Sequence, residues 1–280
     1  MFCIKTGQIP PFSFTAINLS LIMIPGVETV LGYRVSTMRS EQPFSQRLTG
    51  YLQNVDYRAA FEPAEREALF RLRYRCYRRE ETIKANLEER FSDAYDEMDN
   101  CWLFGIYLDD QLVSSIRFHV ISPSAKRGPA YDVFPDIIPR MIDNGLTVID
   151  PTRLVVERRM TELYPELPYV TIRAAFMAAE YYEAEYMLAT VRREHQAFYM
   201  RYFGFEKLCD PRPYPSLLKP ISLLAANMPE KRDQVVDRFP IFHSSFTERR
   251  MLFESSPLHR FLRQDDHERR FEDKTRRVSA

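Results

Sequence analysis

One short stretch constrains the fold of this chain more than any other, the segment TVIDPTRLVV at residues 147–156. Its apolar run is typical of a strand buried inside a sheet. The run nevertheless contains Asp150 and Arg153, and charged side chains are rarely buried without a partner. Removing one partner of a buried pair costs about 3–5 kcal/mol, whereas replacing both by apolar residues can be neutral. The two charges therefore indicate a site more than a device for stability.

Composition excludes several classes of function. Lysine and arginine together number 39, as do aspartate and glutamate, so no overall field attracts nucleic acid. An apolar fraction of 45% can bury a sizeable core, which favours one main domain with extensions. The four cysteines form no CxxC pair, and the five histidines form no HExxH motif. We expect no metal site, no nucleic-acid partner and a reducing, cytoplasmic location.

The N-terminal segment differs from the rest of the chain. Its longest apolar stretch, residues 16–25, is too short to span a bilayer and lacks the cleavage site of a signal peptide. We expect residues 1–40 to be poorly ordered and no integral membrane segment to be present. A more ordinary globular sequence opens at Met38, which is compatible with a start codon placed too early.

The first half of the main domain, residues 41–225, begins with a polar lead-in at 38–53 and a half-buried strand at 55–61. A helix then begins at the Glu-Pro pair of residues 62–63. Arg73 lies in the apolar stripe of this helix, either in a site or as a side chain at the edge of the core. The other arginines of the helix are expected to be solvated or to face an acidic partner: Arg71, Arg75, Arg78 and Arg79.

The following elements alternate between strands and helices. Residues 101–108 and 112–120 predict a hairpin, in whose second strand Arg117 shares a face with His119, while Leu112 shares the other face with Phe118. The next segments are a short helix at 137–141 ended by a glycine, the strand at 147–156, a loop at 161–168, a helix at 169–182, a strand at 186–191, a helix at 195–203 and a last strand at 205–208. A strand, helix and strand in this order imply a right-handed crossover and a partly parallel sheet. Prolines from position 211 onward are expected to end the regular structure, and residues 226–280 to form a helical extension and a charged, disordered tail.

Six charged residues from these elements are candidates for one site. Two of them, in the stretch FSDAYDEMD, also fit a helix cap or a solvated turn. The set contains three acids and three arginines, and such a neutral balance is what a buried network needs. The six are Arg73, Asp93, Asp96, Arg117, Asp150 and Arg153. The absence of GxSxG, P-loop and GxGxxG motifs disfavours hydrolases, kinases and nucleotide-binding folds.

The segment QAFYMRYFGFEKL, residues 196–208, resembles the closing helix and strand of the GNAT acyltransferase fold. Upstream motifs resemble those of the N-acyl amino acid synthase (FeeM-type) family and its relatives, the acyl-homoserine lactone synthases. In chain order they are LFRLRYRCY with Arg73 and Tyr77, SDAYD with Asp93 and Asp96, SIRFH with Arg117, VFP at residues 133–135, and DPTR with Asp150 and Arg153. The resemblance extends from Val55 to the region of Pro220. It implies an α/β (α+β) GNAT fold, a mixed central sheet flanked by helices.

The resemblance also implies an activity, the transfer of a long fatty acyl chain from acyl carrier protein to the amino group of an amino acid. No cofactor is bound, since the phosphopantetheine arm of the carrier belongs to the donor substrate, and the N-acyl product is a candidate for membrane association. The six charged residues would order the loop after the first helix and shape the amino-acceptor pocket. The backbone of Leu154, Val155 and Val156 would hold the thioester and its oxyanion. Tyr199 matches the general acid of some GNAT enzymes, although a packed aromatic side chain is an alternative.

Two departures from the family pattern matter. The usual GNAT pyrophosphate loop is replaced by VERRMTELYPELPY, which disfavours free acyl-CoA and makes Arg158 and Arg159 candidates for contact with the carrier protein or its phosphopantetheine phosphate, or simply solvated charges. The lactone synthases carry a tryptophan beyond the first helix and a glutamate two residues before the first aspartate; here the chain has Trp102 and Phe91. A site for S-adenosylmethionine is thus disfavoured. The alternatives are an acyl-homoserine lactone synthase and a non-catalytic GNAT domain that binds acyl groups or partners, and the C-terminal extension would be a lid over an acyl tunnel or a dimer face.

Overall fold

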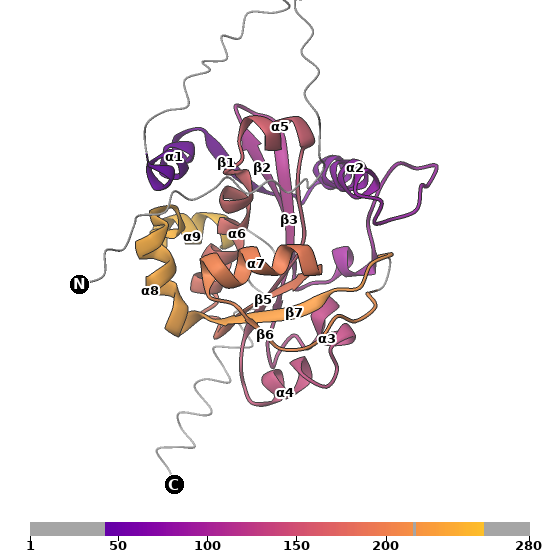
Figure 1. The fold of residues 1–280 in the computed structure, drawn as a ribbon, viewed down its shortest axis with the longest axis vertical. Helices are drawn as coiled ribbons and strands as arrows, with labels where there is room; N and C mark the ends of the chain where they lie inside the picture. Colours follow the sequence, from indigo (N-terminus) through magenta and orange to yellow (C-terminus); the bar gives the residue numbers. More distant parts are fainter. Residues whose placement is uncertain (1–42, 215–216, 255–280) are drawn as a thin grey trace, which may run out of the picture.

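The computed structural model describes residues 43–214 and 217–254 (Figure 1). The segment expected to be poorly ordered at the N-terminus and the charged C-terminal tail lie outside the described residues. Within the described residues, no helix has both the length and the apolar character needed to cross a membrane.

A seven-stranded mixed sheet forms the centre of the molecule, in the order β1-β2-β3-β4-β5-β7-β6. Its strands are β1 Val55–Ala59, β2 Cys101–Leu108, β3 Gln111–Ile121, β4 Val148–Val156, β5 Tyr186–Val191, β6 Glu206–Lys207 and β7 Ser222–Asn227. Only β4 and β5 are parallel, and the other neighbours are antiparallel. The predicted mixed sheet and its parallel pair are therefore confirmed.

The two parallel strands diverge soon after they begin. β4 and β5 are paired only at Val148 with Tyr186 and at Ile149 with Met187. Beyond this point β4 continues along β3, while β5 continues along β7 as far as Val191. Figure 1 shows the consequence: β2 and β3 run up and down the picture, whereas β5 and β7 run across it. The edge of β4 that faces β5 is thus unpaired from Asp150 onward.

Helices cover both faces of the sheet and surround its ends. They are α1 Phe44–Gly50, α2 Pro63–Arg79, α3 Pro129–Val133, α4 Ile138–Asp143, α5 Arg158–Leu163, α6 Leu167–Tyr181, α7 Arg193–Phe203, α8 Met228–Arg238 and α9 Phe246–Phe253, with short 3-10 turns η1 Tyr51–Gln53, η2 Ala94–Glu97 and η3 Pro240–Phe242. The long helix α6 is almost wholly buried against the main core, where its apolar side chains meet Phe104, Ile116 and Phe118 of the sheet. Helix α2 packs on the opposite face, where Leu72 and Cys76 contact Val155 of β4. Its start is fixed by Pro63 and by a capping box between Glu62 and Glu65, as the sequence predicts.

Four expectations about the elements are wrong. The prolines after residue 210 do not end the sheet, because the apolar run at 222–227 forms β7 between β5 and β6. Part of the expected loop at 161–168 belongs to α5, and part of the expected lead-in forms α1, which buries Leu48 in the core. In β3, Val113 is an extra residue between two pairs of the ladder, so Leu112 turns toward α2 instead of sharing a face with Phe118.

The C-terminal helices are built into the main core. Phe239 and Phe242 pack on α6 and α7, and Phe253 reaches the sheet beside Trp102 and Phe104. None of the residues 228–254 lines the cavity described below. The expected role of the C-terminal extension, a lid over an acyl tunnel or a dimer face, stays a prediction.

Candidate active site

The SDAYD motif folds into the 3-10 turn η2, whose ends are held by its own carboxylates. The Asp93 carboxylate accepts from the backbone N–H of Tyr95 at 3.1 Å, and the Asp96 carboxylate accepts from the backbone N–H of Asp93 at 2.9 Å. This is a capping box, in which each aspartate satisfies a donor that the turn leaves free. The cap that the sequence offered as an alternative is therefore real. Both carboxylates also face the sheet and α2, where they can accept further hydrogen bonds.

Three arginines from three elements converge on these carboxylates. Arg73 of α2 donates to Asp96 at 2.7 Å, and Arg117 of β3 contacts both Asp93 at 2.5 Å and Asp96 at 3.1 Å. Arg153 of β4 donates to Asp93 at 2.5 Å. Five of the six predicted charged residues thus form one buried cluster, which we call the acid–arginine cluster.

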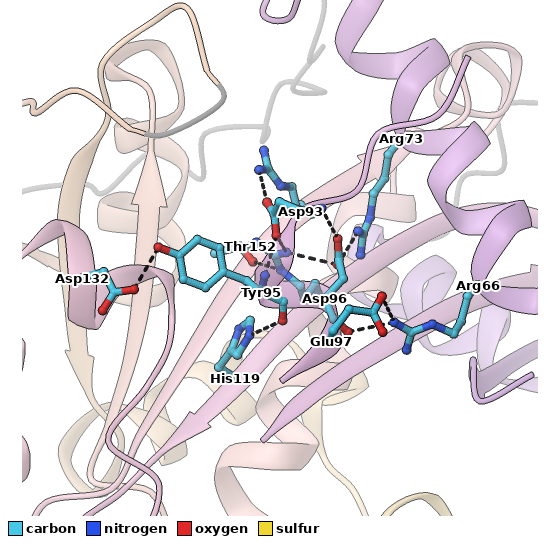
Figure 2. Close-up of polar contacts among 11 residues, drawn as sticks. Arg66, Arg73, Asp93, Tyr95, Asp96, Glu97, His119, Asp132 and Thr152 are labelled. Atoms are coloured by element: carbon cyan, nitrogen blue, oxygen red, sulfur yellow. Dashed lines mark hydrogen bonds and ion pairs between the residues drawn. The ribbon is translucent and has the colours of Figure 1, made fainter. Parts of the chain in front are cut away.

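Further hydrogen bonds tie η2 to its surroundings on both sides (Figure 2). Tyr95 points one way, donating its hydroxyl to Asp132 of α3 at 3.0 Å, while its backbone carbonyl contacts His119 Nε2 at 2.9 Å. On the other side Arg66 donates to Glu97 at 2.7 Å. The loop between α2 and β2 is therefore anchored to two helices and to the central strands.

Electrostatics keep the cluster charged in spite of its burial. Burial opposes ionisation of Asp93, but Arg117 and Arg153 outweigh it and hold the pKa of this carboxyl below its usual range. Burial likewise opposes ionisation of Asp96, and Arg73 and Arg117 again lower its pKa. For the His119 imidazole, burial and the neighbouring Arg117 outweigh the Tyr95 carbonyl and the two aspartates and lower its pKa to about 3, so it is neutral at pH 7.

Asp150 does not belong to the ion-paired cluster, which corrects the expectation from the sequence. One of its carboxylate oxygens accepts from the backbone N–H of Ala130 at 2.9 Å, and the other has no hydrogen-bond partner in the part of the chain that the structure describes. No Lys or Arg of the described residues lies within ion-pair distance of Asp150. Because burial outweighs the Ala130 hydrogen bond and the more distant Arg117, the pKa of Asp150 rises to about 7. Its immediate structural role is to hold the start of α3.

Arg153 stands at a bulge where β4 changes direction. Its φ of 55° is left-handed, and Arg153 and Leu154 together oppose the single residue Ile116 of β3. The bulge sends the Arg153 guanidinium toward Asp93, within 4.2 Å of the centre of the Phe91 ring. Two more rings surround the guanidinium at slightly larger distances, Tyr77 at 5.5 Å and Tyr214 at 5.7 Å. This β4 segment therefore contributes a side chain to the acid–arginine cluster. Its backbone contributes to a neighbouring cavity.

A cavity of about 140 Å³ opens where β4 and β5 separate. Its walls include the β4 segment from Pro151 to Val156, the end of β5 at Thr190 and Val191, and side chains of α2 and α7. Leu154, Val155 and Val156 thus line the cavity at the unpaired edge of a diverging strand, and their expected role in holding the thioester stays a prediction. The cavity meets the acid–arginine cluster at Arg153, which belongs to both, and at Thr152, whose hydroxyl accepts a hydrogen bond from Arg117 of the cluster at 2.9 Å.

Tyr199 of α7 also lines the cavity, and it is buried against Phe198, Phe203 and Phe205. Within the described part of the chain, its hydroxyl has no hydrogen-bond partner. Burial, with a contribution from Tyr77, raises the pKa of this phenol, so it stays protonated at neutral pH. Both expected features of Tyr199, aromatic packing and access to the site, are therefore present together.

Several residues that line the cavity were not predicted from the sequence. His195 contacts Arg192 through Nε2 at 2.8 Å, and burial and Arg192 lower its pKa to about 4. Arg192 is in turn paired with Glu80 at 2.5 Å. Cys76 donates its thiol to the carbonyl of Val156 at 3.4 Å, and burial raises its pKa to about 12. These residues have in common that they face the gap between β4 and β5. The gap forms only in the folded protein, so the sequence gives no local pattern that identifies them.

Arg158 and Arg159 lie outside the cavity. Both are exposed at the start of α5, and Arg158 pairs with Glu162 one turn later at 3.2 Å. The start of α5 is capped by Glu157, whose carboxylate accepts from the backbone N–H of Met160 at 3.2 Å. Negative charge therefore already occupies this helix end. The described residues contain no group of three or more His, Cys, Asp or Glu side chains suited to a metal ion.

Several solved structures are similar to this chain. FeeM, an N-acyl amino acid synthase from uncultured soil microbes, superimposes with a TM-score of 0.55 at 17% identity over 65% of this chain and 95% of that chain. A CoA-dependent acyl-homoserine lactone synthase, BjaI, gives a TM-score of 0.49 at 17% identity over 67% and 89%. An acyl-CoA N-acyltransferase from Pseudomonas aeruginosa gives 0.43 at 19% identity over 61% and 98%. The likeness to FeeM shows the fold, which is GNAT-like, with a mixed sheet and flanking helices.

Comparison with curated proteins gives no match. The family model described as N-acyl amino acid synthase FeeM, in contrast, matches residues 68–227, more than half of the chain. That range runs from the middle of α2 to the end of β7 and includes the acid–arginine cluster and the diverging strands. The chain therefore belongs to the FeeM family of N-acyl amino acid synthases and is an acyltransferase.

Proposed function

We propose that this enzyme transfers a long-chain fatty acyl group from the phosphopantetheine thioester of acyl carrier protein to the amino group of an amino acid. The observation that carries the proposal is the unpaired edge of β4 in the wall of a cavity next to a buried charged cluster. An extended pantetheine arm can lie along such an edge and use the backbone groups that β5 leaves free. An acyl donor and an amine acceptor then approach the same strand from its two sides.

The chemistry needs an oxyanion site and a proton donor. The amine nitrogen attacks the thioester carbonyl, and the backbone N–H groups in the Leu154–Val156 segment stabilise the tetrahedral oxyanion. When the C–S bond breaks, the thiolate accepts the proton of the Tyr199 hydroxyl. The place of Tyr199 in the cavity wall supports this role, and its phenol is protonated at neutral pH before the thiolate forms.

The acceptor amine must also lose a proton. Asp150 has a pKa of about 7, which suits proton exchange near neutral pH, but it is fully buried and lies outside the cavity wall, so it would act on the amine only through an intervening group. The acid–arginine cluster has a separate role in this proposal. Arg73, Arg117 and Arg153 with Asp93 and Asp96 hold η2 and shape the acceptor side of the cavity.

Acyl carrier protein is preferred over free acyl-CoA because of the start of α5. In a helix that binds a pyrophosphate the first backbone N–H groups point to the anion. Here the Glu157 carboxylate takes that position and repels further negative charge. The exposed Arg158 and Arg159 are instead suited to the acidic surface of a carrier protein.

The test is a reaction with defined donors. The enzyme is incubated with acyl carrier proteins of several chain lengths, or with the matching acyl-CoA thioesters, and with a mixture of amino acids. Mass spectrometry is expected to detect N-acyl amino acids with the carrier-bound donors. Product from acyl-CoA alone would overturn the assignment of the donor, and no N-acyl product from any thioester would overturn the function.

A further inference from the structure

Arg79, the last residue of α2, is a cationic side chain in the wall of the cavity. Its Nε is buried without a hydrogen-bond acceptor among the described residues. No carboxylate of the described residues forms an ion pair with it. A buried guanidinium N–H without an acceptor is unfavourable. The sequence predicted that Arg79 is solvated or faces an acidic partner. Its place in the cavity wall instead favours a ligand that supplies the acceptor.

The position of Arg79 relates it to the far end of the donor strand. Cys76 contacts the Val156 carbonyl at the end of β4, and Arg79 follows three residues later on the same side of α2. Val156 lies three residues beyond Arg153, about 10 Å along an extended strand. Arg79 is therefore associated with the end of the cavity that is remote from the acid–arginine cluster.

A second cation comes to the same end of the cavity. The Leu218 N–H donates to the carbonyl of Thr82, just after α2, at 3.0 Å. This contact brings the neighbouring Lys219, which also lines the cavity, close to the end of α2. Within residues 43–214 and 217–254, Lys219 forms no ion pair.

The charges of the cavity wall do not balance. Arg153 is paired with Asp93, and Arg192 is paired with Glu80. The low pKa of His195 leaves it neutral at pH 7. Glu194, which pairs with Arg192 at 3.2 Å, is also close enough to Lys219 for the lysine to help lower its pKa. Among the described residues, Arg79 and Lys219 remain without an ion-pair partner, and this excess of positive charge is suited to a phosphate. The start of α5 cannot take this role, because the Glu157 carboxylate already caps it.

We infer that Arg79, assisted by Lys219, binds the phosphate of the phosphopantetheine arm and so replaces the phosphate-binding helix end that this chain lacks. The inference rests on the proposed function and adds the residue that recognises the donor arm. Acyl carrier protein and CoA both contain this phosphate. Arg79 would therefore recognise the arm, whereas Arg158 and Arg159 would recognise the carrier that bears it.

The experiment removes the phosphate from the donor and the guanidinium from the enzyme separately. The donors are acyl-phosphopantetheine and acyl-pantetheine, used with the wild type, Arg79→Gln and Arg79→Lys. We expect Arg79→Gln to raise KM for the phosphorylated donor about 10–100-fold, with little change for the donor that lacks phosphate. Lysine should restore part of the difference, because it keeps the charge but not the two-pronged geometry.

Controls separate the arm from the carrier. Arg75→Gln, on the exposed side of the same helix, should leave KM unchanged for both small donors. Arg158→Gln should also leave KM unchanged for the small donors and should raise KM only for the donor carried by acyl carrier protein. With acyl-CoA and with acyl carrier protein, Arg79→Gln should raise KM in both cases.

Equal losses for both small donors in Arg79→Gln, or an unchanged preference for the phosphorylated donor, would overturn the inference while leaving the proposed function intact. If the wild type forms no N-acyl product from any thioester, the proposed function fails instead. Calorimetric binding of phosphopantetheine and of pantetheine to the wild type and Arg79→Gln then still decides the inference. Tighter binding of the phosphorylated form that disappears in the variant supports it, and equal binding of the two forms overturns it.

Discussion

At the scale of single residues, Tyr199 offers the cleanest test of the proposed chemistry. Tyr199→Phe removes a hydroxyl that has no partner among the described residues and keeps the ring packing, so the melting temperature should not change. We expect kcat to fall about 100-fold or more, since a positioned general acid contributes on this order. Steady-state rates and thermal melting measure the two effects. Tyr202→Phe, a buried tyrosine of the same helix outside the cavity wall, is the control. Full activity of Tyr199→Phe would show that the leaving thiolate needs no proton from this residue.

Asp150 predicts a pH dependence of stability. Its pKa rises from an ordinary value near 3.8 to about 7 on folding, so the folded state binds the proton more tightly. The stability contributed by this group is present at low pH and is lost as pH rises toward 7. At about 1.4 kcal/mol for each pKa unit, the loss is at most about 4 kcal/mol.

Asp150→Asn removes the charge but keeps an oxygen for the Ala130 N–H. Urea denaturation between pH 5 and pH 8 should show a smaller fall in the free energy of unfolding for this variant than for the wild type. The interpretation fails if the two curves are parallel.

The site residues that could be predicted from the sequence are charged residues in segments that are otherwise apolar. Arg73 occupies the apolar stripe of its helix, Arg117 shares one face of a hairpin strand with His119, and Asp150 and Arg153 interrupt an apolar strand. Arg79 could not be predicted in this way, because it is the last residue of a helix, where arginine is common on a solvated surface. The environment of the Asp150 carboxylate could not be predicted either. One of its oxygens accepts from the backbone of Ala130, which is 20 residues away in the chain and comes near only in the folded protein.

At the scale of elements, η2 is the part that depends most on paired charges. Asp96→Asn would leave Arg73 and Arg117 buried without a full counter-charge, and we expect a loss of about 3–5 kcal/mol in the free energy of unfolding. Glu97→Gln is the matched control, because that neighbouring pair with Arg66 is exposed and should contribute about 1 kcal/mol or less. Chemical denaturation of the two variants compares them directly. Equal stability of the two variants would mean that the cluster does not hold the turn.

Elements with a strong local signal were predictable, and those that depend on tertiary context were not. The boundaries of β2 and β5 agree with the sequence, because both are short apolar runs between clear turns. β7 was missed since four prolines precede it and its run is brief. The divergence of β4 from β5 has no local signal at all, because it arises from the pairing of β5 with β7.

At the scale of the whole molecule, the C-terminal helices are a structural part of the enzyme. Arg173 of α6 is buried and donates to the Ile241 and His243 carbonyls and to Glu248, which fastens η3 and α9 to the central helix. Phe253 then inserts beside Trp102, Phe104 and Phe118. The two contacts tie the end of the described chain to its middle.

Phe253→Ala should therefore lower the free energy of unfolding by about 3–5 kcal/mol, as expected for a fully buried ring. Because α9 does not line the cavity, the preference among acyl chain lengths should be unchanged in the folded protein. Denaturation and product profiles measure both quantities, with the exposed Met251→Ala as control. A shifted chain-length preference would instead place this helix at the acyl chain.

The bulge at Arg153 and Leu154 sets the phase of everything that follows it in β4. Side chains alternate along a strand with a period of two, so removal of one residue there would turn each following side chain to the opposite face. Arg153 would lose its approach to Asp93, and the backbone of Val155 and Val156 would exchange its outward and inward groups. The number of residues between Asp150 and Val156 is thus as much a part of the site as their identity.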